Sequence, residues 1–160
     1  MTTINRLEKK IGITFSKPEL LKQALVHRSY LNEHPDFELG HNERLEFLGD
    51  AVLELVVTEN LYNNYPNPEG ELTNWRASLV NSQMLATIAH KLNIEQFLYL
   101  SRGESKDTNS KARDYILANA VEAIVGAAYL DGDLIAKGNG TSKQEAQLDA
   151  ATAALKAKNW

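Results

Sequence analysis

The sequence contains no cysteine among its 160 residues. This absence excludes disulfide bonds, metal sites built on thiolates and cysteine nucleophiles. It is also typical of proteins that work in a reducing compartment, so we expect a cytoplasmic location. The fold must therefore be held by a packed core, and an apolar content of 43% is enough to build one.

A long uninterrupted apolar run is also missing. The most apolar stretch, Ala51 to Val57, is interrupted by Glu54 and is far shorter than the about 20 residues that a membrane-spanning helix needs. The first ten residues are polar and charged, and no apolar stretch follows them. We therefore expect neither a secretory signal nor a membrane partner.

Basic residues are not in excess either. The chain has 17 Lys and Arg against 21 Asp and Glu, which gives a net charge of −4. Surfaces that bind nucleic acid without specificity are usually positive, so this balance argues mildly against a polyanionic partner. Bound divalent cations could offset part of the deficit locally.

What the sequence does contain is a series of helical patterns. Apolar residues recur at helical spacing in four segments, roughly 16–27, 42–62, 71–92 and 113–130. Ser16 and Glu19 have the form of a capping box at the start of the first segment. The core positions expected in the third segment are Leu72, Trp75, Leu79, Leu85 and Ile88. Residues 101–110 are predicted to be a loop. Because no strand pattern occurs before residue 132, we predict an all-α helical bundle.

The composition changes after Asp131. Glycines surround a short apolar stretch, and Ser142 with Glu145 forms a second capping box ahead of an alanine-rich helix. We therefore divide the chain into a helical domain over residues 1–131 and a short strand-and-helix segment over residues 132–160.

Three acidic residues in the second helical segment have a spacing that places them together. Glu43, Glu46 and Asp50 are spaced i, i+3, i+7 and fall within an arc of roughly 60° on one helix face. Apolar residues flank them on almost all sides, which predicts a buried helix. Carboxylates close together in such surroundings repel each other and lose hydration, so their pKa values should rise unless a positive group intervenes.

A second polar pair lies in the last of these segments. Asn119 and Glu122 are spaced i, i+3 in a helix rich in small residues, whose face allows close packing. If this helix packs against the acidic one, four oxygen-bearing side chains converge: Glu46, Asp50, Asn119 and Glu122. Oxygen ligands without cysteine or clustered histidine favour Mg²⁺ or Mn²⁺ over zinc. Such a site suits phosphodiester hydrolysis.

The spacing alone leaves a second interpretation open. Acidic triplets at this spacing more often belong to a solvated helix face, where they pair with bases such as Arg44. The apolar surroundings favour the metal site, but the residue pattern does not decide between the two.

A continuous run of residues suggests a family. Residues 42–53, Asn-Glu-Arg-Leu-Glu-Phe-Leu-Gly-Asp-Ala-Val-Leu, resemble the signature of the ribonuclease III family. Further similar segments follow in the family's order: residues 24–30, 76–80, 100–104 and 116–131. The resemblance covers residues 1–131. It implies an all-α endonuclease domain that forms a homodimer and cleaves double-stranded RNA.

The resemblance also implies roles for particular residues. By position, Glu46, Asp50, Asn119 and Glu122 would bind Mg²⁺, with Mn²⁺ as a substitute, and Asp50 and Glu122 would be catalytic. The implied products carry 5′-phosphate and 3′-hydroxyl ends, as in the processing of ribosomal RNA precursors.

Two further positions of the signature have weaker assignments. Glu43 matches an acidic position beside the metal ligands or close to a phosphate. Phe47 matches an aromatic position associated with the dimer interface, although plain core packing explains an aromatic residue here equally well.

The sequence departs from the family pattern in two places. Asn119 stands where the family often has Asp, and an amide brings no charge, so weaker metal binding is expected. The family also carries a complete double-stranded-RNA-binding domain, of which residues 132–160 resemble only the last strand and helix. Lys143 and Gln144 match phosphate-contacting positions of that helix, so a weak RNA contact is expected there.

These departures keep an alternative function open. A non-cleaving double-stranded-RNA-binding or structural protein could use the same fold, which Asn119 and the incomplete C-terminal module favour slightly. The presence of Glu46, Asp50 and Glu122 disfavours it. A third possibility is a small nuclease that relies on structured RNA and needs no binding module.

Overall fold

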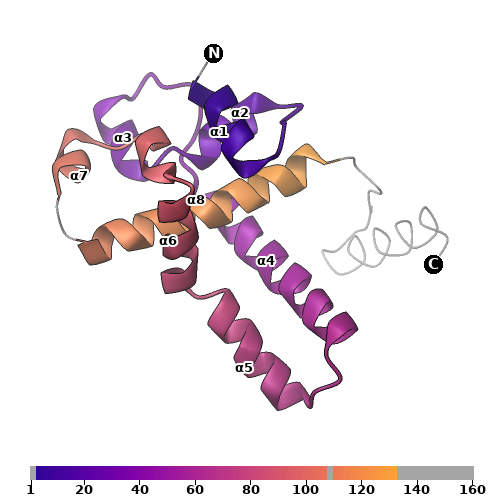
Figure 1. Ribbon diagram of the computed structural model, residues 1–160. Helices are drawn as coiled ribbons and strands as arrows, with labels where there is room; N and C mark the ends of the chain where they lie inside the picture. The colour runs from indigo at the N-terminus through magenta and orange to yellow at the C-terminus, as the bar shows by residue number, and fades with distance from the viewer. Residues whose placement is uncertain (1–2, 108–109, 133–160) are drawn as a thin grey trace, which may run out of the picture.

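The computed structural model describes residues 3–107 and 110–132, and these residues form helices without a strand (Figure 1). In chain order the helices are α1 (Thr3–Ile11), α2 (Pro18–Ala24), α3 (Arg28–Glu33), α4 (Glu43–Asn64), α5 (Glu69–Leu79), α6 (Ser82–Lys91), the 3-10 helix η1 (Ile94–Phe97), α7 (Arg102–Lys106) and α8 (Ser110–Asp131). The predicted all-α fold is confirmed. The strand and helix expected after residue 132 lie outside the described residues.

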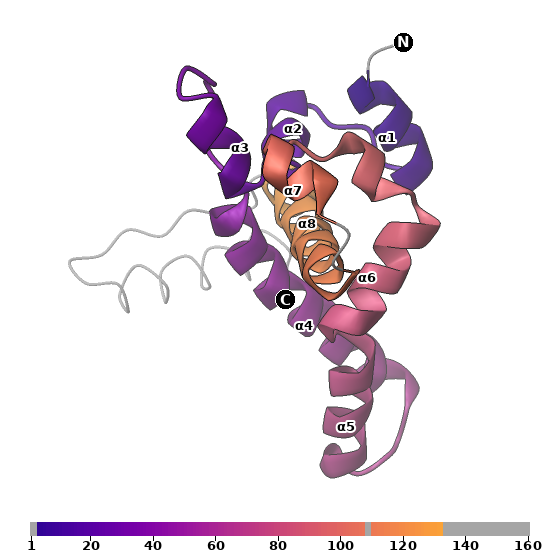
Figure 2. The same ribbon diagram turned by 90° about the vertical axis from the view of Figure 1, so that its left-hand side faces the viewer.

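Helix α8 lies at the centre of the fold. Helices α2, α4 and α6 pack against it, and α4 and α5 form a hairpin that extends away from the other helices (Figures 1 and 2). The largest share of the buried core comes from α8 itself: Leu117, Ala118, Ala120, Val121, Ala123, Ile124 and Ala127. Its small side chains let neighbouring helices approach closely, as the sequence predicts. Within the described residues, no helix is both long enough and apolar enough to span a bilayer.

The helix predicted over residues 71–92 is in fact two helices. Asn81 takes an extended conformation between α5 and α6, and its side-chain oxygen accepts a hydrogen bond from Met84 N at 2.9 Å. Asparagine is among the best residues for starting a helix in this way, so it ends the continuity that the apolar spacing suggests. Leu85 is buried as expected, but Leu79 and Ile88 are exposed.

The beginning of α2 also differs from its prediction. Ser16 does not cap the helix; the backbone N–H groups of Ser16 and Lys17 donate instead to the two carboxylate oxygens of Asp131, at 2.8 and 2.7 Å. The N-cap residue of α2 is Lys17, so Ser16 lies one residue before the position that a capping box requires. The contact fixes the end of α8 to the start of α2.

Another difference lies in the predicted loop over residues 101–110. It contains the short helix α7, which begins at Ser101, where the side-chain hydroxyl accepts from Glu104 N at 3.1 Å. A hydroxyl at this position satisfies a helix N–H group that would otherwise lack a partner.

The segment before α3 connects distant parts of the chain. Val26 and Tyr99 form an isolated parallel bridge, in which Tyr99 N donates to Leu25 O at 3.0 Å and His27 N donates to Tyr99 O at 3.1 Å. Asn42 is buried and donates its backbone N–H to Val26 O at 2.9 Å. These bonds fix the segment against the first turn of α4.

Candidate metal centre

The predicted acidic residues are brought together where α4 crosses α8. A Cβ atom on Gly49 would lie 1.7 Å from the Glu122 carbonyl oxygen, and one on Gly126 would lie 2.2 Å from the Leu45 carbonyl oxygen. The two backbones therefore touch at this crossing, and no side chain separates them. As a result, the residues that precede and follow Gly49 on α4 face those of α8 at short range.

The electrostatics of Glu122 show which residues meet there. Burial raises the pKa of Glu122 to about 7, and the nearby charges of Asp50 and Glu46 add to the rise. The half-buried carboxyl thus has two acidic neighbours from α4. The fold therefore brings Glu46 and Asp50 of α4 near Glu122 of α8.

Glu46 has a similar environment with one compensating contact. Burial raises its pKa first, and the charge of Glu43 adds to this, whereas a side-chain hydrogen bond from Asn119 lowers it. Asp50 raises the pKa further. The Asn119 amide therefore lies against Glu46, where it stabilises the charged carboxylate.

Together these side chains supply a donor set of oxygen atoms. They come from Glu46 and Asp50 on α4 and from Asn119 and Glu122 on α8. Within residues 3–107 and 110–132, no three His, Cys, Asp or Glu side chains stand close enough to surround a metal ion. Mg²⁺ usually takes only one or two protein carboxylates and completes its shell with water and phosphate oxygens. The donor chemistry therefore fits a magnesium ion.

Glu43 lies at the edge of this acidic cluster. It is the first residue of α4 and is exposed, and its Oε1 lies 3.2 Å from Arg28 Nη1. Its Oε2 lies 3.7 Å from His41 Nδ1. The charge of Glu43 raises the pKa of Glu46, but it is not among the charges that raise the pKa of Glu122. Glu43 is thus a neighbour of the site.

The predicted burial of α4 is wrong for the single chain. Phe47 is 82% exposed, and Leu55, Val56 and Tyr62 along the same helix are exposed as well. The buried residues of α4 are Leu45, Gly49 and Leu61. Core packing is therefore excluded as the role of Phe47. The residues that suggested a buried helix form an apolar surface that no other described element covers.

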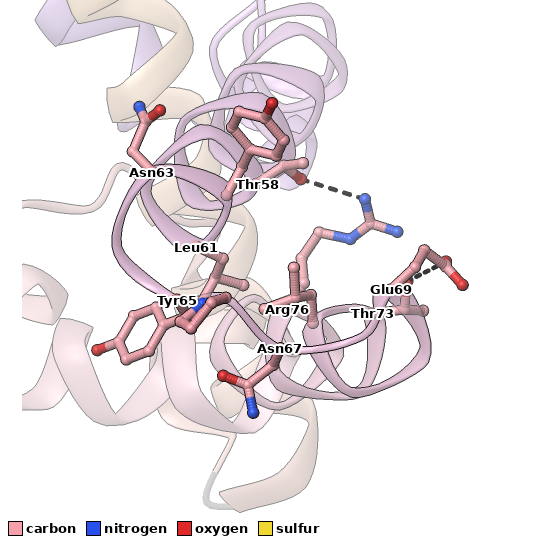
Figure 3. A pocket seen from close by; sticks show the side chains of 11 residues that line it. Thr58, Leu61, Asn63, Tyr65, Asn67, Glu69, Thr73 and Arg76 are labelled. Carbon is pink, nitrogen blue, oxygen red and sulfur yellow. Dashed lines mark hydrogen bonds between the residues drawn. The ribbon is translucent and has the colours of Figure 1, made fainter.

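A hollow of about 780 Å³ lies at the opposite end of α4 (Figure 3). The last turns of α4 and the helix α5 line it, and Arg76 Nη1 donates across it to Thr58 Oγ1 at 3.1 Å. None of the predicted site residues lines this hollow. It lies beyond residue 57, more than a full helical turn from Asp50, so it is separate from the acidic site.

Some features of the site have no clear signal in the sequence. The role of Gly49 is hidden inside the signature run, although a glycine in the interior of a long helix suggests a close approach of another backbone. The ion pair between Arg28 and Glu43 joins the first residues of α3 and α4, which are 15 positions apart, and no helical spacing reveals it. Lys143 and Gln144 lie outside the described residues.

Comparison with known proteins places this geometry in context. Residues 17–138 match the family described as "Ribonuclease-III-like", and residues 121–158 match the "Double-stranded RNA binding motif". Curated relatives include Ribonuclease 3 of Oceanobacillus iheyensis, which is 50% identical over 129 residues, or 80% of this chain and 56% of the relative. Ribonuclease 3 of Streptococcus thermophilus is 46% identical over 130 residues, 81% of this chain and 56% of the relative.

Solved structures show the same similarity. The nuclease domain of ribonuclease III from Campylobacter jejuni, described for its structural flexibility in a region involved in dimer formation, superposes with a TM-score of 0.68. It is 34% identical, and the superposition covers 99% of this chain and 100% of that one. A second crystal structure of that domain has 35% identity and the same TM-score, and covers 98% and 96% of the two chains. The chain spans about half the length of the curated relatives it matches.

Proposed function

Because this chain belongs to the ribonuclease III family, we propose that it is an endoribonuclease that cleaves double-stranded RNA. The observation that supports this most is the convergence of Glu46, Asp50 and Glu122 at the crossing of α4 and α8. Burial and neighbouring carboxylates raise the pKa values of Glu122 and Glu46, so their charged forms are unfavourable in the metal-free protein. A function that requires a bound cation is the simplest reason for such an arrangement.

Mg²⁺ is the cation that we propose, with Mn²⁺ as a substitute. Glu46, Asp50, Glu122 and Asn119 would hold it, and Asp50 and Glu122 would be catalytic. When bound, the ion would supply positive charge that polarises the phosphoryl oxygens and favours the attack of water. The products would carry 5′-phosphate and 3′-hydroxyl ends.

The chain's own residues have distinct tasks in this proposal. The carboxyl group of Glu122, with a pKa of about 7, can hold or release a proton near neutral pH. Asn119 orients Glu46 through its hydrogen bond. The touching backbones at Gly49 and Gly126 keep the two halves of the site at a fixed separation.

A homodimer is part of the same proposal. The exposed apolar surface around Phe47 would pair with its copy on a second chain, and the related nuclease domain has a region involved in dimer formation. Two-fold symmetry would place two acidic sites on opposite RNA strands. We expect the natural substrates to be structured cytoplasmic precursors such as those of ribosomal RNA.

We further propose that the nuclease domain comprises residues 1–131. The end of α8 at Asp131 supports this boundary. Residues 132–160 would be the remnant of a double-stranded-RNA-binding domain, in which Lys143 and Gln144 make a weak contact with RNA.

The test is cleavage of a perfect RNA duplex by the full chain in Mg²⁺. We expect cleavage by the unmutated protein and none by Glu122→Gln, which keeps the size of the side chain but removes its charge. Equal activity in the variant would refute the proposed site.

A non-cleaving RNA-binding protein is the second candidate, favoured by the uncharged Asn119 and by the absence of a tight three-ligand cluster in the described residues. Gel-shift binding without cleavage across Mg²⁺ and Mn²⁺ titrations would support it. Under the nuclease proposal, Asn119→Asp should instead cleave at lower Mg²⁺ concentrations, because a fourth carboxylate strengthens cation binding.

A further inference from the structure

Two nitrogen groups beside the acidic cluster have no part in the metal site. They are the His27 imidazole and the Arg28 guanidinium, which stand at the start of α3. The Val26 carbonyl accepts from Asn42 N at 2.9 Å, so this segment is fixed against the first turn of α4. Arg28 Nη1 lies 3.2 Å from Glu43 Oε1, one helical turn before Glu46. The charge of Glu43 also acts on the His27 imidazole, so both groups lie near the edge of the site.

The hydrogen bonds of His27 define which of its nitrogens carries the hydrogen. Nδ1 accepts from the backbone N–H of Ser29 at 3.4 Å and lies 2.8 Å from Ser29 Oγ. That hydroxyl oxygen accepts in turn from Ser101 N at 3.1 Å. Because Nδ1 accepts from Ser29 N, it carries no hydrogen, so the hydroxyl donates to it and the neutral ring carries its hydrogen on Nε2. Burial lowers the pKa of His27, which keeps the ring neutral.

The Nε2–H group of His27 is an accessible donor without a partner. Within the described part of the chain, no group makes a hydrogen bond to Nε2, and this atom is not among the buried unpaired ones. The backbone N–H and the hydroxyl of Ser29 thus hold the Nδ1 edge of the ring, and Ser101 N in turn holds the hydroxyl. The neighbouring Arg28 side chain is 69% exposed.

We propose that His27 and Arg28 bind a phosphate of the RNA backbone next to the one that is cleaved. The proposal rests on the proposed function and names a contact of the same site with its substrate. A guanidinium supplies charge and two parallel donors, and the oriented imidazole N–H adds a third. Glu43 is then a positioning residue that holds the guanidinium beside the acidic cluster in the free protein.

A simpler explanation of Arg28 makes a different prediction. If the guanidinium only neutralises Glu43, its removal should have no effect on RNA binding once Glu43 is also neutral. If it contacts a phosphate, its removal should weaken binding whether or not Glu43 is charged. A double-mutant cycle between Arg28→Ala and Glu43→Gln separates the two explanations.

The experiment measures duplex RNA binding by the full chain in a Glu122→Gln background, at fixed Mg²⁺ and over a series of KCl concentrations. Loss of one phosphate contact should reduce the slope of log K against log salt by about one, so we expect this for Arg28→Ala with or without Glu43→Gln. Arg6→Ala is the matched control, because Arg6 is an exposed arginine on α1, on the far side of α2 from α3 (Figure 2).

His27→Asn tests the imidazole separately. Asparagine can still accept from Ser29 N and start α3, but it is too short to replace the Nε2–H donor. Because this donor is uncharged, binding should weaken roughly tenfold with no change in the salt slope. Circular dichroism verifies that α3 and the rest of the fold remain.

The outcomes are distinct. An Arg28→Ala variant with unchanged slope, or one whose effect disappears with Glu43→Gln, overturns the proposal. So does a complete lack of duplex binding by the parent protein. Binding with the expected slopes by a chain that never cleaves RNA would leave this contact standing and would refute the nuclease function alone.

Discussion

At the scale of single residues, Glu122 shows how the fold changes the chemistry of a carboxyl group. Its raised pKa comes mainly from burial in the small-residue face of α8 and then from the charges of Asp50 and Glu46. The ionised form is thus unfavourable in the metal-free protein. A bound cation would reverse this, because it favours the charged carboxylate.

This shift makes the stability of the metal-free protein depend on pH. The pKa of Glu122 rises from an ordinary 4.5 to about 7 on folding. The stability linked to this group is therefore fully present below pH about 4.5 and is lost as pH rises through about 7. Glu122→Gln should leave stability unchanged in acid and raise it at alkaline pH by roughly 1 kcal/mol, a value reduced because the carboxyl is only half-buried.

Urea denaturation with a chelator present, at pH values on both sides of this range, measures the difference between the two proteins. A Glu122→Gln variant that is less stable than the parent at alkaline pH would show that the carboxylate is already compensated without metal. The same linkage predicts that Mg²⁺ affinity rises with pH up to about 7, which calorimetric titration can follow.

At the scale of the helices, the crossing of α4 and α8 decides whether the site exists. Glu46 and Asp50 lie on α4 on either side of Gly49, and Glu122 lies on α8 where the Gly49 backbone touches it. Any side chain at Gly49 would separate the two pairs of ligands. The short distance between the acidic residues of α4 and Glu122 of α8 thus depends on the glycine at position 49.

Gly49→Ala should therefore damage both stability and activity. Its Cβ would lie 1.7 Å from the Glu122 carbonyl oxygen, so the helices must move apart. We expect a loss of about 3 kcal/mol in the free energy of unfolding, together with weaker Mg²⁺ binding in the fraction that folds. Thermal denaturation and calorimetry measure the two effects.

Gly70→Ala is the matched control within α5. A Cβ there meets nothing within 4 Å, so the substitution should be neutral or stabilise the protein by up to about 1 kcal/mol through helix propensity. If Gly49→Ala behaved like this control, the two backbones would not be in contact in solution.

The helices also show how far the sequence could predict the structure. Apolar spacing and the small-residue segment were enough to predict α4 and α8, whereas their packing against each other was only a condition of the predicted metal site. They failed where a single polar side chain decides the local structure, as Asn81 does between α5 and α6 and Asp131 does at the start of α2. Asp131 acts over 115 residues, and a contact of that range leaves no local periodicity.

The burial of α4 could not be predicted for a different reason. Apolar residues lie on almost every face of α4, but α8 covers only one of these faces in the single chain. Sequence shows that such a surface must be covered, but it does not show whether the same chain or another one covers it.

At the scale of the whole molecule, the exposed apolar surface of α4 suggests that two chains associate through it. Phe47→Ala should weaken a homodimer by roughly 2 kcal/mol or more, as the loss of a central aromatic contact does. It should hardly change the stability of the monomer, because the ring is 82% exposed there. Sedimentation over a range of protein concentrations measures the dissociation constant.

Ile13→Ala provides the control, since Ile13 is another exposed apolar residue but lies between α1 and α2. It should leave the dissociation constant unchanged. A dimer that tolerates Phe47→Ala as well as it tolerates Ile13→Ala would place the interface elsewhere.

The central position of α8 has a consequence for how the protein is made. The helices α2, α4 and α6 are synthesised first, yet each of them packs mainly on α8, which leaves the ribosome last among the described helices. Until α8 has emerged, the growing chain lacks the helix that supplies the largest share of the core. We therefore expect folding to be delayed until α8 has been translated, so that the acidic cluster forms together with the fold itself.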